Sequence, residues 1–310
     1  MRARDVLEKL PELLKPHKGD AMLKIEKPGI HNISAELYHA DPCPEPSLSS
    51  GIANILLKKS PLHARNAHPR LNPNFTEKNS ETFDLGTVAH QVFLEGDFTN
   101  IAVIDYDDWR TSAAKEARAN AYLEGKTPIL EKNMSRVRAM VIEAQMAAAG
   151  FGEIDSMACG RAEQTLTCKI ENAWFRARLD WLQNDKKIII DYKTTESANP
   201  DDFINRSIIQ TGYDVQAAFY LRLLKELTGV EAKFIWMVQE NTAPYACSFV
   251  SMGEQMLDYA SRKVTHAMQL WRGCIGTDTW PSYDKQVHYA DMPAWAANKA
   301  EEFLLNEEKS

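Results

Sequence analysis

The spacing of hydrophobic positions is helical in the first half of the chain. In SLSSGIANILLKKSP, serines stand where a helix N-cap would lie and Pro61 ends the apolar pattern, so we expect a helix over residues 50–59. DLGTVAHQVFLEG predicts a short helix that opens after Gly86 and closes at Gly96. From residue 108 to residue 149 the pattern is helical and alanine-rich, with a break around GKTPI.

Beyond residue 160 the pattern becomes that of strands alternating with long helices. RAEQTLTCKI, AWFRARLDWL and KKIIIDYKTT read as strands, and the connectors ENA and QND are short enough for hairpins. YDVQAAFYLRLLKELTG is an amphipathic helix, AKFIWMVQE and YACSFVSM are two further strands, and EQMLDYASRKVTHAMQLWRG is another helix. The pattern predicts an α/β fold of the α+β type, with a mixed central sheet flanked by helices.

The same pattern suggests how the chain is divided. Residues 1–45 read as a short helix followed by a proline-rich loop, and we expect an N-terminal arm there. Residues 46–310 are expected to form one domain, with a helical part to about residue 158, a catalytic sheet with its helices over 159–275, and a C-terminal tail over 276–310.

Composition narrows the class of protein. No apolar run approaches the ~20 residues of a membrane span, so a cytoplasmic protein without a membrane partner is expected. The five cysteines are widely spread without a CxxC pair, which argues against zinc and iron–sulfur sites. The net charge of −7 argues weakly against nucleic-acid binding, but charge is segregated: KKSPLHARNAHPR is basic and EEFLLNEEKS is acidic.

The hairpin formed by ARLDWL and KIIIDYK groups its charges by strand parity. If a tight loop at residues 184–185 joins the strands, Asp180 lies opposite Ile189 and shares a face with Asp191 and Lys193. Any even loop length preserves this grouping, whereas a slip of one residue inverts it. The opposite face is then apolar, and it collects Leu179, Trp181, Ile188, Ile190 and Tyr192.

Two carboxylates and an ammonium beside an apolar layer suit a hard divalent cation such as Mg²⁺. Oxygen ligands from one or two carboxylates, together with waters and a substrate phosphate, would complete an octahedral shell. Lys193 could hold a water or stabilise the charge of a transition state. The alternative is a simple Lys–Asp ion pair where a strand leaves the core.

The arrangement of Asp180, an apolar strand, and Asp191-x-Lys193 is similar to the motif of the PD-(D/E)XK nuclease superfamily. A proline often precedes the first aspartate in that motif, and Leu179 stands at this position here. YDVQAAFY resembles the QxxxY motif of RecB-type nucleases, and GTVAH resembles their GxxxH element. The resemblance implies a restriction-endonuclease-like core.

Longer stretches resemble the exonuclease VIII (RecE) C-terminal nuclease family over nearly the whole chain from about residue 30. They are YHADPCPEPSLSSGIANILLKKSPLHAR, WRTSAAKEARANAYLEGKTPIL and WPSYDKQVHYADMPAW. The resemblance implies that Asp180 and Asp191 bind metal, with the backbone carbonyl of Tyr192 as a further ligand. It makes Lys193 the catalytic lysine, while His90 completes the metal site or approaches the scissile phosphate.

Three further residues receive roles in the same way. Gln216 and Tyr220 lie four positions apart on one helical face and would orient the lysine, the DNA end or a phosphate. Glu163 looks like the extra acid found upstream in several of these nucleases. Each has a structural alternative: an ordinary amphipathic helix for the first two, and an exposed strand position for Glu163. A core histidine is the alternative for His90.

The family resemblance also implies a substrate and partners. Such enzymes degrade linear double-stranded DNA from its ends, 5′-to-3′, and leave 3′ single strands for recombination and repair, often in phages. The expected cofactor is Mg²⁺, with Mn²⁺ also supporting activity, and the expected partners are a homo-oligomeric ring and a RecT-like annealing protein. Solvent-exposed surface is the alternative for each candidate DNA contact: Lys58, Lys59, Arg65, Arg110, Lys115 and Arg118.

Two other functions stay open at this point. A Cas4-like or RecB-like enzyme would cut single strands or act as an endonuclease, although the four-cysteine cluster that many of them carry has no counterpart among these cysteines. A non-catalytic DNA-binding module could also keep this fold. Such a module has no need to hold two carboxylates beside a lysine.

Overall fold

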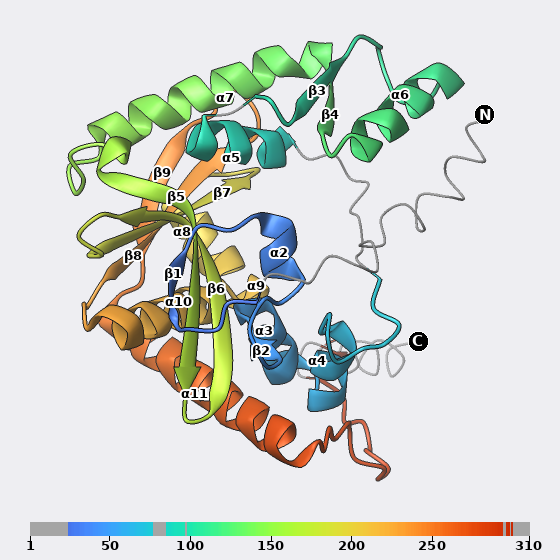
Figure 1. Ribbon diagram of the computed structural model, residues 1–310, viewed down its shortest axis with the longest axis vertical. Coiled ribbons are helices and arrows are strands. Elements are labelled where there is room, and N and C mark those ends of the chain that lie inside the picture. Colours follow the sequence, from blue (N-terminus) through green and yellow to red (C-terminus); the bar gives the residue numbers. More distant parts are fainter. Residues whose placement is uncertain (1–23, 77–84, 97, 294–295, 298, 300–310) are drawn as a thin grey trace, which may run out of the picture.

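The computed structural model describes residues 24–76, 85–96, 98–293, 296–297 and 299. These residues form a central sheet with helices on both of its faces (Figure 1). The expected helix near the N-terminus and the end of the expected C-terminal tail lie outside the described residues. Within the described ranges, no helix combines the length and the apolar character needed to cross a bilayer.

The central sheet is mixed, as the sequence predicts. Its strand order is β1-β5-β6-β7-β8-β9, with β2 paired to β6. The β7/β8 and β2/β6 pairs are parallel, and the other pairs are antiparallel. The strands are β1 (Gly29–His31), β2 (Ser47–Leu48), β5 (Gly160–Ile170), β6 (Ala173–Gln183), β7 (Ile188–Thr195), β8 (Lys233–Glu240) and β9 (Cys247–Ser251). The α/β fold class is therefore confirmed.

The helices agree with the hydrophobic pattern in their main outlines. They are α2 (Ala35–His39), α3 (Ser50–Lys58), α4 (Pro61–Ala67), α5 (Leu85–Glu95), α6 (Ser112–Leu123), α7 (Glu131–Gly150), α8 (Pro200–Asp202), α9 (Ile209–Thr211), α10 (Tyr213–Thr228) and α11 (Glu254–Thr277), with a 3₁₀ turn at Met157–Cys159 and a π-helix at Phe203–Ile208. The hydroxyl of Ser49 caps α3, as the serine pattern predicts. The break at GKTPI is a strand, β4 (Thr127–Leu130), which pairs in parallel with β3 (Ile101–Ile104).

Two hydrophobic cores lie on opposite faces of the sheet. The larger core packs α3, α10 and α11 against one face, and its members include Phe219, Trp236 and Trp271. The smaller core lies under α5 and α7 on the other face (Figure 1). Ile189 belongs to the larger core and Ile190 to the smaller, because side chains alternate along β7. The odd-numbered residues of β7 therefore face α10.

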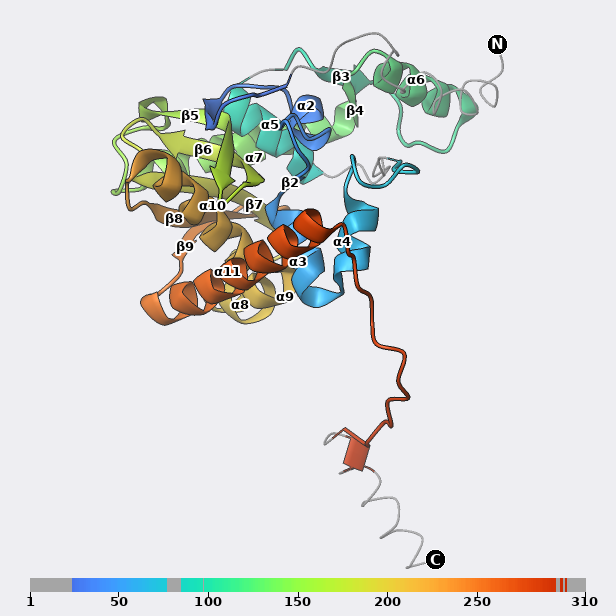
Figure 2. The same cartoon turned by 60° about the horizontal axis from the view of Figure 1, so that its bottom comes forward.

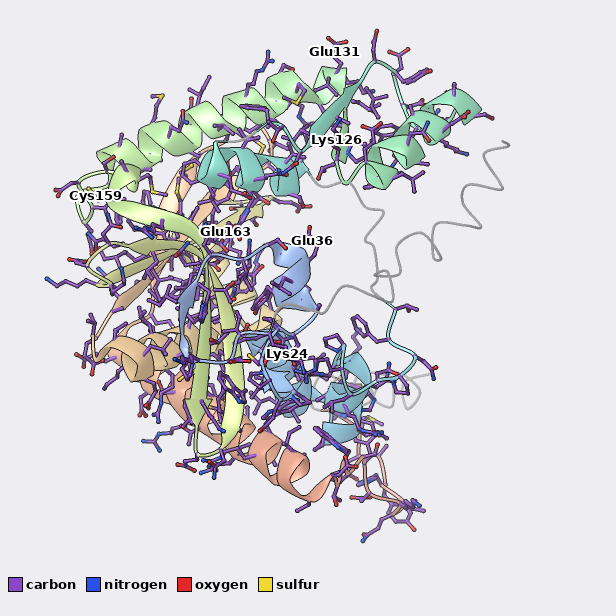
Figure 3. The ribbon with its side chains drawn as sticks, viewed as in Figure 1. Lys24, Glu36, Lys126, Glu131, Cys159 and Glu163 are labelled. Atoms are coloured by element: carbon purple, nitrogen blue, oxygen red, sulfur yellow. The ribbon has the colours of Figure 1, made fainter. Side chains whose placement is uncertain are left out.

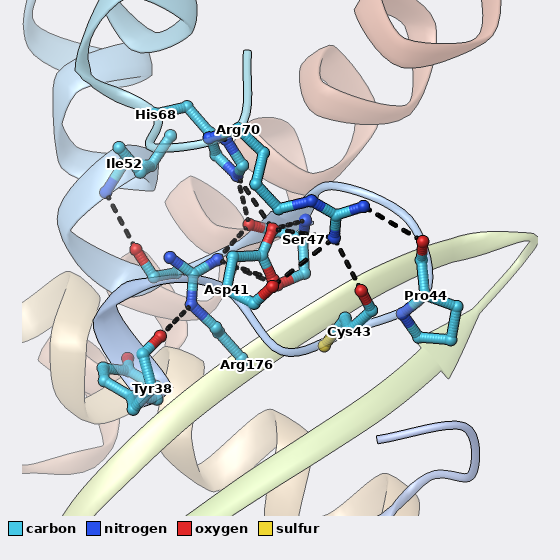
Figure 4. Close-up of polar contacts among 10 residues, drawn as sticks. Tyr38, Asp41, Cys43, Pro44, Ser47, Ile52, His68, Arg70 and Arg176 are labelled. Atoms are coloured by element: carbon cyan, nitrogen blue, oxygen red, sulfur yellow. Dashed lines mark hydrogen bonds and ion pairs between the residues drawn. The ribbon is translucent and has the colours of Figure 1, made fainter. Parts of the chain in front are cut away.

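Residues 24–45, which the sequence assigns to an N-terminal arm, are packed against the sheet. Strand β1 pairs with β5, and the Asp41 side chain is fully buried. We name the polar group around this carboxylate the anchor cluster: Asp41, Ser47, His68, Arg70 and Arg176 (Figure 4). It joins this segment to β6, because a buried carboxylate is stable only when it is paired and hydrogen-bonded.

The end of α11 joins the small helices. Figure 2 shows α3 and α4 beside this end, from which the chain continues away from the body of the protein. The backbone N–H of Leu62 in α4 donates to the carbonyl of Pro281 at 3.0 Å, and the rings of Trp271 and Trp280 lie 5.5 Å apart. These contacts fix the first residues after α11 against α4.

The predicted register of the β6–β7 hairpin is wrong by two residues. The structure pairs Leu182 with Ile189, where the sequence places Asp180, because the connecting loop spans four residues instead of two. A shift of two preserves the grouping by parity, and Leu182 and Ile189 lie in the same core. Leu179 also packs in this larger core, so its predicted place beside Trp181 is wrong.

This second error has a local cause on the neighbouring strand. The β5–β6 ladder pairs residues 162 and 164 with 181 and 179, whereas the intervening Glu163 and Asp180 do not form a ladder pair in these described strands. Glu163 has a φ of 54°, in the left-handed region that side chains other than glycine rarely adopt. The simple alternation assumed for β6 fails at this point.

Candidate active site

The candidate active site lies where β6 and β7 separate. Within these two strands, ladder pairing is confined to Trp181–Ile190 and Leu182–Ile189. At the next position the Asp180 carboxylate takes the place of a backbone acceptor, since its Oδ2 accepts the backbone N–H of Tyr192 at 2.8 Å. The strands can therefore part without leaving this buried N–H unpaired.

Three metal-ligating side chains meet at this separation. Helix α5 supplies His90, β5 supplies Glu163 and β6 supplies Asp180, and one donor atom of each lies within 4.8 Å of the others. His90 Nε2 is 3.0 Å from Asp180 Oδ2, and its Nδ1 is 3.9 Å from Glu163 Oε1. Figure 3 shows Glu163 on β5 close to α5. A helix and two strands from separate parts of the chain thus form one cluster.

Glu163 is held from the other side by an arginine. Arg178 Nε donates to Glu163 Oε2 at 2.5 Å, and Arg178 Nη1 donates to the carbonyl of Ile33 at 2.7 Å. Together with the positive φ of Glu163, these bonds direct its second oxygen toward His90. Backbone strain of this kind costs of order 1–3 kcal/mol and is concentrated at functional sites.

Beside this cluster lies a second group on β7 and α10. Lys193 Nζ is 2.5 Å from Asp191 Oδ2, and Gln216 Nε2 donates to Asp191 Oδ1 at 3.1 Å. Gln216 Nε2 also lies 3.2 Å from the hydroxyl of Tyr220, and Lys193 Nζ lies 5.1 Å from the ring centre of Tyr213. The residues of the QxxxY stretch thus contact the DYK stretch directly.

The two aspartates have opposite pKa shifts. Burial raises the pKa of Asp191 to about 6, and the neighbouring Asp180 adds to this while Lys193 opposes it. Burial also acts on Asp180, but the His90 and Lys193 charges and the Tyr192 N–H outweigh it, so its pKa lies below the ordinary value. Opposite shifts in neighbouring carboxylates are typical of sites that handle charge or protons.

The basic groups respond to the same carboxylates. Burial alone would lower the pKa of His90, but Asp180 and Glu163 raise it above the ordinary value. The pKa of Lys193 is likewise raised, because Asp191 and Asp180 outweigh burial. Burial raises the pKa of Glu163, although the charge of Arg178 opposes this. Because its own pKa is raised, Lys193 keeps its positive charge.

The donors of the three-residue cluster fit a divalent cation. Two carboxylate oxygens and an imidazole nitrogen within 4.8 Å of one another match the ligands that Mg²⁺ and Mn²⁺ accept. Asp191 is not one of these three residues, and its oxygens contact Lys193 and Gln216. Metal binding by Asp191 and by the carbonyl of Tyr192 stays a prediction.

The candidate DNA contacts lie in two groups on one side of the molecule. One is on α3 and α4, and the other is on and before α6 (Figure 1). Lys58 Nζ donates to the Gln210 carbonyl at 2.7 Å, and Arg110 is paired with Asp108. Lys59 and Lys115 are exposed.

The two remaining arginines are less accessible than these. Arg65 is half-buried, and the Arg118 guanidinium lies over the rings of Trp109 and Tyr122. DNA binding by all six residues stays a prediction.

The sequence reasoning missed two polar residues next to the site. Arg178 holds Glu163, and the buried Gln239 of β8 accepts a hydrogen bond from the Tyr192 hydroxyl. A signal for each exists in the chain. Arginines alternate with apolar residues in AWFRARL, and a single glutamine follows the apolar run of the strand AKFIWMVQE.

Comparison with solved structures supports the fold. The chain is similar to a protein of Eubacterium rectale named "Putative exonuclease", with 12% identity, a TM-score of 0.53, and coverage of 85% of this chain and 97% of that one. A protein named SSO0001 has 14% identity and covers 61% of this chain and 87% of its own, but its TM-score of 0.26 is too low to indicate a shared fold. At these identities the first likeness shows the fold alone.

Sequence comparisons give the family. No curated protein matches the chain. The family described as "PDDEXK-like domain of unknown function (DUF3799)" matches residues 56–293. This range contains the whole site and most of the chain, so the PD-(D/E)XK prediction is confirmed at the level of the superfamily. The chain belongs to the family of PDDEXK-like domains described as DUF3799.

Proposed function

We propose that this protein is a metal-dependent deoxyribonuclease that degrades linear double-stranded DNA from its ends. The observation that carries the proposal is the meeting of His90, Glu163 and Asp180 beside the Asp191–Lys193 pair. A binding module gains nothing from burying a surplus of acid, which costs free energy unless a cation compensates it. The family and the likeness to a protein named as an exonuclease add support.

The residues divide the hydrolysis of a phosphodiester between them. His90, Glu163 and Asp180 would hold a divalent cation, Mg²⁺ or Mn²⁺, which when bound neutralises phosphate charge and acidifies a water molecule. Lys193 is positioned to hold the attacking water or to stabilise the charge that develops on the phosphate. Gln216 would hold the Asp191 carboxylate and the Tyr220 hydroxyl in place through its hydrogen bonds, and Asp191 would orient the ammonium of Lys193.

We extend the proposal, on the resemblance to the exonuclease VIII family, to the finer points of activity. Degradation runs 5′-to-3′ and leaves 3′ tails for recombination or repair, in a phage or its host. A homo-oligomeric ring keeps the enzyme on its DNA, and a RecT-like protein receives the single strand. The basic side chains on or next to α3, α4 and α6 contact the DNA backbone, and the acidic net charge of −7 agrees with this because only the surface that contacts DNA must be basic.

The test compares three substrates with two variants. End-labelled linear duplex, closed circular duplex and single strands are incubated with Mg²⁺ or Mn²⁺ and with wild-type protein, Asp191→Ala or Asp185→Asn. Asp185 is the matched control, because it lies in the turn of the same hairpin, is about half exposed, and can still cap the turn as asparagine. We expect wild type and Asp185→Asn to degrade linear duplex alone, and Asp191→Ala to be inactive.

Other outcomes separate the alternatives. Cutting of closed circles would contradict an exonuclease, and digestion confined to single strands would indicate a RecB-like or Cas4-like enzyme. DNA retained by an inert wild type in a gel-shift assay would indicate a binding module. Equal activity of Asp191→Ala and wild type would remove this site from the reaction.

A further inference from the structure

Gln239 of β8 is fully buried beside the candidate active site without being part of it. Its Nε2 donates to the carbonyl of Met140 in α7 at 2.9 Å and to the carbonyl of Tyr245 in the β8–β9 turn at 3.0 Å. Both partners are pure acceptors, so they determine which way the amide points. Its oxygen must therefore face the other way, toward β7.

The group on β7 that meets this oxygen is the Tyr192 hydroxyl, which donates to Gln239 Oε1. Tyr192 is 2% exposed, so no bulk water can replace this bond. An unpaired buried hydroxyl costs about 1–3 kcal/mol. The far end of the Tyr192 ring is thus fixed by an amide that α7 and the β8–β9 turn hold in place.

The other end of Tyr192 is part of the site. Its ring centre lies 5.9 Å from that of His90 and 5.1 Å from that of Phe93, both on α5. Its backbone N–H donates to Asp180 Oδ2 at 2.8 Å, and this oxygen is also 3.0 Å from His90 Nε2. Tyr192 therefore touches two of the three residues of the metal-ligating cluster, one by its ring and one by its backbone.

We propose that Gln239 is a positioning residue of this cluster and that it orients His90 and Asp180 through the hydroxyl of Tyr192. The proposal rests on the proposed function, because it assigns Gln239 to the same metal-binding cluster. Groups that orient metal ligands typically change metal affinity by about 10- to 100-fold when they are removed. The contact here is indirect, so we expect the lower end of that range.

The link also explains a polar residue in an apolar layer. Ile235 and Met237 precede Gln239 at alternate positions of β8, and both belong to the smaller core under α7. A third apolar side chain at residue 239 would continue this layer. It would leave the hydroxyl of Tyr192 unpaired and free to turn the ring away from His90. A positioning role accounts for the glutamine, whereas packing alone does not.

The test is a double-mutant cycle read by Mn²⁺ affinity. Isothermal titration calorimetry of the DNA-free protein measures the Mn²⁺ dissociation constant of wild type, Gln239→Met, Tyr192→Phe and the double variant. Methionine matches glutamine in length, and phenylalanine keeps the ring and the backbone N–H. We expect each single variant to weaken Mn²⁺ binding about tenfold and the double variant to be no weaker than either.

The control separates positioning from general stability. Ser251→Ala removes a hydrogen bond from the Ser251 hydroxyl to the Phe234 carbonyl (2.8 Å) on the far side of β8, away from the cluster. We expect it to lower the melting temperature and to leave Mn²⁺ affinity at the wild-type value. If Gln239→Met does not fold, Tyr192→Phe alone decides, because it removes the same bond from the other end.

Two results would overturn the proposal, and they differ in what else they overturn. If wild type binds Mn²⁺ and degrades DNA while Tyr192→Phe and Gln239→Met bind Mn²⁺ equally well, Gln239 is structural only and the proposed function stands. If wild type does not bind Mn²⁺, the proposed function fails and the positioning role fails with it. Additive losses in the double variant would also contradict a pathway through Tyr192.

Discussion

Two clusters of charged residues lie along strand β6, and they differ in which charge is in excess. In the anchor cluster, one carboxylate, that of Asp41, is surrounded by Arg70, Arg176 and His68 within 3.6 Å. Its two oxygens also accept the Ser47 N–H and hydroxyl, at 2.9 and 2.6 Å. Asp41, Ser47, His68 and Arg176 are buried, while the Arg70 side chain is 23% exposed.

In the candidate active site, carboxylates outnumber the permanent cations. Among the described residues, the carboxylates of Glu163, Asp180 and Asp191 form ion pairs with two permanent cations, Arg178 and Lys193, and with the titratable imidazole of His90. The His90 and Asp180 side chains are 30% and 15% exposed, so solvent and a ligand can reach them. Under the proposed function, a bound divalent cation compensates the surplus of acid at this partly open site.

The largest expected effect separates activity from stability at the site. Asp180→Asn keeps an acceptor for the Tyr192 N–H but removes a charge from the metal-ligating cluster. We expect DNA degradation to fall by about 10³-fold, since several kcal/mol of charge stabilisation are lost. Urea unfolding should show a stability change within about 1 kcal/mol, because like charges are also relieved. A large loss of stability would place Asp180 with the structural acids.

The anchor cluster should show the opposite result. Arg176→Met leaves Asp41 buried with one partner fewer, so we expect a loss of about 3–5 kcal/mol in the free energy of unfolding. The folded fraction should retain wild-type cleavage per molecule. Arg222→Met is the control, since Arg222 forms an exposed i,i+4 pair with Glu226 and should cost only about 0.3–0.5 kcal/mol. Equal losses in both variants would refute the anchoring role.

Metal addition should stabilise through one cluster and not through the other. At 100 times its dissociation constant, Mn²⁺ should raise the free energy of unfolding of wild type by about 2.7 kcal/mol. Asp180→Asn should lose this gain, and Asp41→Asn should keep it although it starts from a less stable protein. Chemical denaturation with and without Mn²⁺ measures both, and a Mn²⁺ effect that disappears in Asp41→Asn would contradict the assignment.

The smallest expected effect is a pH dependence carried by Asp41. Burial opposes its ionisation, but hydrogen bonds from His68 and Ser47 and the charge of Arg176 hold its pKa below the ordinary value. A lowered folded-state pKa contributes stability above the unfolded pKa of about 4, and this contribution is lost as pH falls through the folded value. The stability difference between wild type and Asp41→Asn should therefore shrink below about pH 4. A constant difference from pH 7 to pH 3 would disprove it.

The local pattern of the chain predicts most of the elements. The helices over 50–58, 85–95 and 213–228 follow from their caps and spacing, and the five strands β5 to β9 follow from alternation. Strands β1 and β2 have three and two residues and exist only through their partners β5 and β6, so local pattern does not predict them. The anchor cluster is likewise made of contacts between distant segments.

The sequence predicts those residues of the site that lie in local motifs. It does not predict the contacts that depend on how distant segments pack together. The loop length shifts the register of β6 and β7 by two, and the alternation assumed for β6 fails beside Asp180, so parity alone does not place this carboxylate with the charges of β7. Metal binding by Asp191 stays a prediction, and its contacts with Gln216 and Lys193 in the structure have no local sequence signal. This arrangement depends on how α10 docks on β7. The left-handed backbone of Glu163 is also set by tertiary contacts and has no sequence signal.

The bond from the Tyr192 N–H to the Asp180 carboxylate has a consequence for measuring this site. Most amides of the central sheet are protected from hydrogen exchange by backbone carbonyls, but this amide is protected by a side chain that is also a proposed metal ligand. The exchange rate of the Tyr192 amide should therefore change when a cation binds the Asp180 carboxylate, and this change needs neither substrate nor turnover. The exchange rate of this one backbone proton would therefore report whether the proposed metal site is occupied, and NMR can measure it in the intact protein.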